Sequence, residues 1–208
     1  YKIYFYIFCF YIISKANING VIYPFSFGLL FALMWCNNNV LILAPLYIAA
    51  MFLGTFSLQS LYCALATVIV MLVTYGIHYK LKKRMNYWQI LCYGLLSQVA
   101  FIVLNILAGG SIVYTILSVV FGLLFMFAAL KIFEAIATKG FAYKLTVDEV
   151  ICAGVVLMAL SSGLGEFSLG NFDLIKLFAA FIILTVAHTF NISTALFTAG
   201  IMGFGAML

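Results

Sequence analysis

Long apolar runs separated by short polar breaks follow one another along the whole chain. A bilayer core of about 30 Å requires about 20 helical residues, or fewer where flanking side chains reach the headgroups. The pattern therefore predicts about nine membrane-spanning helices. These segments are 1–13, 21–36, 40–56, 58–79, 88–108, 112–133, 148–163, 172–188 and 190–208. For the short segments 21–36 and 148–163, tilting, burial against neighbours and re-entry all remain open.

The breaks between the runs contain residues that end or begin helices. Gly109 and Gly110 supply the backbone freedom that a tight helical hairpin needs. Thr146 and Glu149 have the spacing of a capping box, in which the hydroxyl accepts from a backbone N–H and the carboxylate reaches back to the first residue. We therefore predict a helix start at Thr146.

Composition supports a membrane protein. Hydrophobic residues make up 67% of the 208 residues and charged residues 7%, and the mean hydropathy is +1.25. A soluble domain of this size could not cover so much apolar surface with polar groups. The predicted fold is an all-α polytopic membrane helix bundle, with the lipid bilayer as its principal partner. The cell membrane is its expected location.

Positive charge predicts the orientation. The net charge is +5, but the basic residues lie between apolar runs, so we expect headgroup contacts and no nucleic-acid partner. The loop 80–87 is the most basic, and we place it in the cytoplasm. This assignment puts eight of the ten Lys and Arg residues inside, with the N-terminus cytoplasmic. The topology-setting residues are Lys80, Lys82, Lys83 and Arg84.

Both ends of the chain lie within apolar runs, and we expect a fragment that is cut at each end. Nine crossings would leave residue 208 outside the cell. A tenth helix would then return the chain to the cytoplasm, where a soluble domain absent from this fragment would follow.

Two further segments have more than one interpretation. Residues 134–147 are expected to form a connector in the headgroup layer, with a partner-binding cytoplasmic helix as the alternative. In the last segment Ala195, Ala199 and Gly203 recur at four-residue spacing, which lets helix backbones approach closely in lipid. Packing within the chain is favoured over a dimer face, although self-association remains an alternative.

Ionisable groups within a membrane are costly and usually functional. All five acids of this chain fall at predicted helix ends or in loops, and the sequence contains no Walker A loop, HExxH motif or nucleophile elbow. We therefore predict no catalytic, cofactor-binding or metal-binding residue here. The acids are Glu134, Asp148, Glu149, Glu166 and Asp173.

The remaining polar and sulfur-containing side chains have simple expected roles. His78 is expected at the interface, and His188 in a structural hydrogen bond. The five scattered cysteines are expected to be apolar fillers. The amides inside or near apolar runs are expected to hydrogen-bond between helices, with a substrate path as the alternative. These amides are Gln59, Gln98 and Asn105.

Two stretches resemble the membrane region of the stage II sporulation protein E family. Residues 23–32, Tyr-Pro-Phe-Ser-Phe-Gly-Leu-Leu-Phe-Ala, are similar to the Pro-Phe element that opens that family's second helix. Residues 145–152, which run on to Ser162-Gly163-Leu164, resemble a late acidic helix start. The glycine-rich residues 199–205 are similar to the family's closing spans.

The resemblance implies ten spans, a central cytoplasmic region and a C-terminal metal-dependent protein serine phosphatase that activates a sigma factor. It implies Mn or Mg only in that downstream domain, and division proteins at the septum as partners. Together with the lack of buried charge, this favours a membrane-anchoring and localising region of a larger signalling protein. The alternative is a small-solute transporter or a substrate-binding membrane subunit.

Overall fold

The structure is a computed structural model that describes residues 2–16, 18, 24–36, 40–54, 58–81, 85–139, 146–165, 168–169, 172–189 and 192–207. Within these ranges the chain forms nine helices and one two-stranded hairpin. The helices are α1 (Lys2–Lys15), α2 (Ser26–Cys36), α3 (Val40–Gly54), α4 (Leu58–Leu81), α5 (Tyr87–Leu107), α6 (Ile112–Lys139), α7 (Val147–Gly165), α8 (Leu174–Thr189) and α9 (Ile192–Met207). The strands β1 (Ser168–Leu169) and β2 (Phe172–Asp173) pair antiparallel between α7 and α8.

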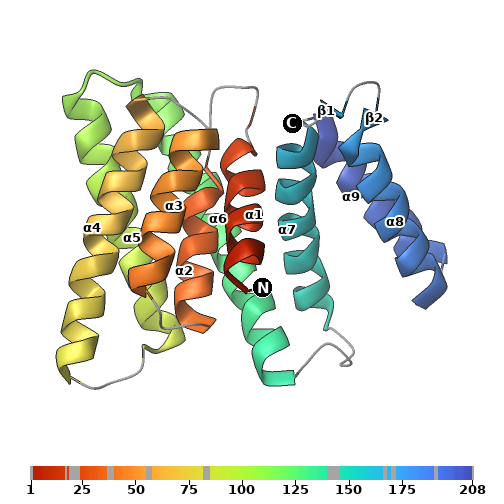
Figure 1. The fold of residues 1–208 in the computed structure, drawn as a ribbon, viewed down its shortest axis with the longest axis horizontal. Coiled ribbons are helices and arrows are strands. Elements are labelled where there is room, and N and C mark those ends of the chain that lie inside the picture. Colours follow the sequence, from red (N-terminus) through yellow and green to blue (C-terminus); the bar gives the residue numbers. More distant parts are fainter. Residues whose placement is uncertain are drawn as a thin grey trace.

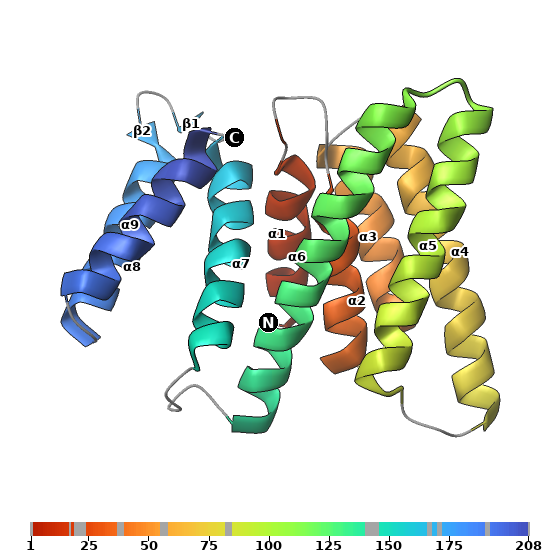
Figure 2. The same cartoon turned by 180° about the vertical axis from the view of Figure 1, so that it is seen from behind.

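Successive helices run in alternating directions, so the labelled ends N and C fall toward opposite ends of the bundle (Figure 1). Helices α1 to α6 form one body, and α7 lies between this body and the α8–α9 pair (Figures 1 and 2). Helix α2 is the centre of the larger body, because nine of its 11 residues are buried. A helix that is apolar all round is typical of such a central position.

The outside of the bundle is apolar. Leu53, Leu107 and Phe181 are 71%, 79% and 67% exposed, and many other large apolar side chains share this exposure. Four helices are long and apolar enough to cross a membrane: Ser60–Lys80, Tyr87–Leu107, Ile112–Thr138 and Val147–Gly165. The other five helices are apolar but shorter. The structure therefore confirms an all-helical fold with a membrane protein's surface, and the number of spans stays a prediction.

The end of α6 and the start of α8 are among the helix boundaries that differ from the predicted ones. Helix α6 continues to Lys139, so the first part of the predicted connector 134–147 is helical. Within this extension the Thr138 hydroxyl donates to the Glu134 carbonyl one turn earlier, at 2.7 Å. Helix α8 begins at Leu174 and not at Phe172, because Phe172 and Asp173 pair with β1. Residues 140–145 of the connector lie outside the described residues.

The alternating directions also sort the described charges between the two ends. The four lysines Lys2, Lys80, Lys131 and Lys139 belong to one end of the bundle, and Lys15 and Lys176 to the other. Lys82, Lys83 and Arg84, which carry most of the charge in loop 80–87, lie outside the described residues. Among the described lysines, the end predicted to be cytoplasmic therefore carries four and the opposite end two.

Candidate functional site: a buried polar cluster

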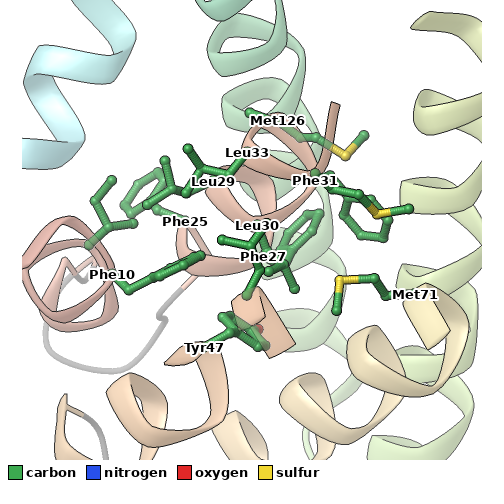
Figure 3. Close-up of a cluster of buried hydrophobic side chains, with 14 of the residues drawn as sticks. Phe10, Phe25, Phe27, Leu29, Leu30, Phe31, Leu33, Tyr47, Met71 and Met126 are labelled. Carbon is green, nitrogen blue, oxygen red and sulfur yellow. The ribbon is translucent and has the colours of Figure 1, made fainter. Parts of the chain in front are cut away.

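The interior of the larger body is an apolar cluster centred on α2. Phe27, Leu30 and Phe31 from α2 are almost completely buried there, with Phe10, Met71 and Met126 from other helices around them (Figure 3). Tyr47 of α3 lies in the same cluster and is fully buried. Its ring packs edge-on against Phe10, with centroids 5.9 Å apart. This packing fixes the place of the Tyr47 hydroxyl inside the bundle.

Four polar or sulfur-containing side chains form a buried cluster with Tyr47. The Tyr47 side chain lies close to those of Ser26, Cys63 and Thr67. Cys63 in turn lies close to Gln98. These residues come from α2, α3, α4 and α5, so the cluster joins four helices. All five are at least nine-tenths buried, with exposed fractions between 0% and 6%.

The cluster is only partly satisfied by direct hydrogen bonds. The Thr67 hydroxyl donates to the Cys63 carbonyl one turn earlier, at 2.6 Å. Among the described residues, however, the Ser26 hydroxyl, the Tyr47 hydroxyl and the Gln98 side-chain nitrogen have no partner in hydrogen-bonding geometry. These groups are close to one another or to Cys63 but are not aligned for direct bonds. Buried polar groups are rarely left this way, and each costs about 1–3 kcal/mol when unpaired.

The local sequence explains part of this arrangement. Cys63 and Thr67 are four residues apart and therefore share one face of α4. Ser26 begins α2 two residues after Pro24, where the chain turns into the helix. Gln98 belongs to the predicted set of interhelical amides. Cys63 is buried, as expected of a small filler, but its polar neighbours lie on other helices or one turn away and were not predicted.

A second amide behaves as predicted. Asn105 of α5 donates to the Thr115 hydroxyl of α6 at 2.6 Å, across the hairpin that Gly109 and Gly110 form. Gly109 has a φ of 79°, a left-handed conformation that glycine adopts without strain. The expectation of an interhelical hydrogen bond is thus confirmed for Asn105. For Gln59 the side chain is outside the described part of the structure.

His78 differs from its expected setting at the interface, whereas the structural hydrogen bond expected of His188 stays a prediction. His78 is only 7% exposed, and its Nε2 lies 2.9 Å from the Tyr93 hydroxyl of α5. It therefore packs between α4 and α5, where Tyr93 supplies the polar partner that the headgroups were expected to supply. His188 is exposed at the end of α8.

The predicted capping residues form both hydrogen bonds of a capping box at the start of α7. The Thr146 backbone N–H donates to Glu149 Oε2 at 2.7 Å, and the Glu149 N–H donates to Thr146 Oγ1 at 3.4 Å. Lys131 of α6 forms an ion pair with Asp148 at 3.9 Å. A similar N-terminal bond at α5, from the Asn86 N–H to Gln89 Oε1 at 2.9 Å, escaped the sequence analysis. The spacing Asn-x-x-Gln is the sequence pattern that would have predicted this bond.

The packing face of α9 is turned relative to the predicted stripe. Ala195 is buried and Ala199 is half-buried, but Gly203 is exposed with open space around it. Gly205 makes the close approach instead: a Cβ there would lie 2.5 Å from the Met158 carbonyl oxygen of α7. Gly203 therefore makes no close helix contact with the part of the chain that the structure describes. The four-residue spacing predicted Gly203 on the packing face of α9, but Gly205, two residues further along the helix, faces α7 instead.

Ionised groups are absent from the described part of this polar cluster, and the described residues contain no group of three His, Cys, Asp or Glu side chains that could hold a metal ion. What the cluster offers is neutral hydrogen bonding from hydroxyl, amide and thiol groups. Glu166, one of the five acids, lies outside the described ranges. Comparison with family models, curated proteins and solved structures found no match.

Proposed function

We propose that the chain is the membrane-anchoring and localising region of a larger signalling protein. The observation that supports this proposal is the distribution of charge: within the described helices, Asp, Glu, Lys and Arg residues occupy only the first or last few turns. Ion-coupled carriers and intramembrane enzymes place ionisable groups deeper. A neutral interior inside an apolar surface fits a bundle that holds its position in lipid.

The orientation belongs to the same proposal. The end of the bundle that carries Lys2, Lys80, Lys131 and Lys139 faces the cytoplasm, following the positive-inside rule. Single-cysteine variants test this in a background without the native cysteines. A membrane-impermeant maleimide applied to intact cells should label Lys15→Cys and should label Lys80→Cys only after the cells are opened. The reverse pattern would overturn the orientation.

The resemblance to the sporulation phosphatase family extends the proposal to a location, the division septum, where division proteins are the expected partners. The test is a fluorescent protein fused to the N-terminal end of the chain in an endospore-forming bacterium. We expect the fluorescence to concentrate at the septum. Gln98→Ala serves as the matched variant and should localise like the parent, since an anchor does not depend on one buried amide. Uniform membrane fluorescence would refute the localising role.

The buried polar cluster favours a second candidate function, a carrier for a small neutral solute. Gln98 and Tyr47 would then contact the solute, and uptake would depend on them. Proteoliposomes containing the parent chain or Gln98→Ala distinguish the two functions. Uptake of a neutral solute by the parent that Gln98→Ala abolishes would replace the anchor by the carrier.

A further inference from the structure

We propose that the buried polar cluster binds a water molecule, held between Ser26, Tyr47 and Gln98 at the junction of α2, α3, α4 and α5. The inference goes beyond the proposed function, because an anchor requires no internal guest. Three observations support it. The side chains are buried, their polar atoms are unpaired, and Tyr47 lies close to Ser26 and to Cys63, which in turn lies close to Gln98.

The burial of the three groups means that bulk solvent does not satisfy them. Ser26, Tyr47 and Gln98 are 2%, 0% and 1% exposed. Each contributes an N–H or O–H that finds no aligned acceptor among the described residues. Three unpaired donors in one place would cost several kcal/mol at about 1–3 kcal/mol each. A shared guest that accepts their hydrogen bonds removes most of this cost.

The chemistry of the unpaired atoms selects the guest. The Gln98 Nε2 group can only donate, so it requires an acceptor and disfavours a cation. The hydroxyls of Ser26 and Tyr47 can each donate or accept. Water accepts two hydrogen bonds and donates two, and buried waters usually make about three bonds to groups that would otherwise be unsatisfied. A neutral guest also avoids the cost of placing an ion in a site without counter-charge.

The geometry explains why the side chains do not simply pair with one another. The Tyr47 ring packs against Phe10, and the Thr67 hydroxyl donates its only hydrogen to the Cys63 carbonyl, so it can offer its neighbours an acceptor but no donor. The hydroxyl of Tyr47 therefore has a fixed position, and neither it nor the Gln98 Nε2 group has a direct hydrogen-bond partner among the described residues. A bridging water spans such gaps at nearly the enthalpy of a direct hydrogen bond. The guest thereby links α2 and α3 to α5.

Infrared difference spectroscopy of the whole purified chain in lipid tests the proposal. A buried, strongly bonded water gives a sharp O–H stretching band that shifts when the sample is exchanged into water enriched in oxygen-18. We expect such a band in the parent and its loss in Gln98→Met, which keeps the side-chain volume but removes the donor. Ser97→Ala is the matched control: Ser97 is also buried on α5, but its hydroxyl already bonds the Gly94 carbonyl at 2.8 Å.

The Cys63 thiol gives a second, native readout beside the site. Its S–H stretching band is identified by its absence in Cys63→Ala, and it should shift in Gln98→Met and stay unchanged in Ser97→Ala. A parent without an oxygen-18-sensitive band would overturn the proposal even if every variant failed to fold. A band that changes when chloride is replaced by nitrate would overturn it too, since the guest would then be an anion.

Discussion

Gly28 on α2 is the position where replacing one hydrogen by a methyl group should separate two helices. A Cβ at Gly28 would lie 2.9 Å from both the backbone N and the Cα of Met126 on α6, and 2.8 Å from Phe125 Cδ1. Carbon atoms in contact prefer about 3.5–4.0 Å. The Phe125 ring could turn, but the Met126 backbone cannot. In Gly28→Ala, α2 and α6 must therefore move apart by roughly 0.6–1 Å.

The size of the effect follows from two opposing contributions. Overpacking a tightly packed interior costs about 1–3 kcal/mol. Replacing a helical glycine by alanine returns up to about 1 kcal/mol through helix propensity. Gly76→Ala on α4 isolates the second contribution, because a Cβ there meets nothing within 4 Å. The difference between the two variants should thus be the overpacking cost alone, or roughly 2–12 °C in melting temperature at about 2–4 °C per kcal/mol.

A fluorogenic maleimide measures the melting temperature in detergent, because the thiols of Cys63 and Cys152 are buried and react only on unfolding. The measurement uses a background in which Cys9, Cys36 and Cys92 are replaced by serine. We expect Gly28→Ala to melt below Gly76→Ala. If the two melt together, the close approach of α2 and α6 is wrong, and with it the central position of α2.

Three further changes test other contacts. Gly205→Ala should lower the melting temperature by several degrees, whereas Gly203→Ala should leave it unchanged, because only Gly205 faces the α7 backbone. If Gly203→Ala instead loses an oligomer that the parent forms on size-exclusion chromatography, Gly203 belongs to a dimer face. Asn105→Leu should destabilise the chain by about 0.6 kcal/mol. Because the Thr115 hydroxyl bonds both Asn105 and the Ser111 carbonyl, Thr115→Val should cost less when Asn105 is already replaced than in the parent. Strictly additive losses in this double-mutant cycle of detergent unfolding would contradict the bond between Asn105 and Thr115. Thr146→Ala should lower the free energy of unfolding by about 0.5–2 kcal/mol and speed amide hydrogen exchange in the first turn of α7. Unchanged exchange would argue against the capping box.

The sequence was informative at several places where the structure is local. The capping box at Thr146 and Glu149 involves residues three apart, and the hairpin at Gly109 and Gly110 depends on the conformational range of glycine, so both can be read from adjacent residues. The segmentation into apolar helices also follows from the sequence, because lipid imposes both helix formation and an apolar surface. The boundaries near Phe133 and Phe172 were less exact, since helical Ala and Lys residues continue α6 and strand pairing delays α8.

The direction in which each helix faces could not be obtained in this way. In a soluble helix the polar face marks the outside, but lipid is about as apolar as the protein interior, so a membrane helix carries no comparable mark. Helix α9 is an example, because the sequence did not show that Gly205, and not Gly203, is the glycine that contacts α7. The burial of His78 against Tyr93 is another case, because its partner lies on a different helix.

The amino-acid sequence by itself determined that this chain is a set of apolar helices with its charges at their ends, because the bilayer penalises every other arrangement. Only the tertiary structure decided that Ser26, Tyr47, Cys63, Thr67 and Gln98 meet in one buried cluster. Their meeting depends on how four helices are ordered and rotated about their axes. Side-chain packing between segments distant in the sequence sets this arrangement, and it produces no periodic pattern within any one helix.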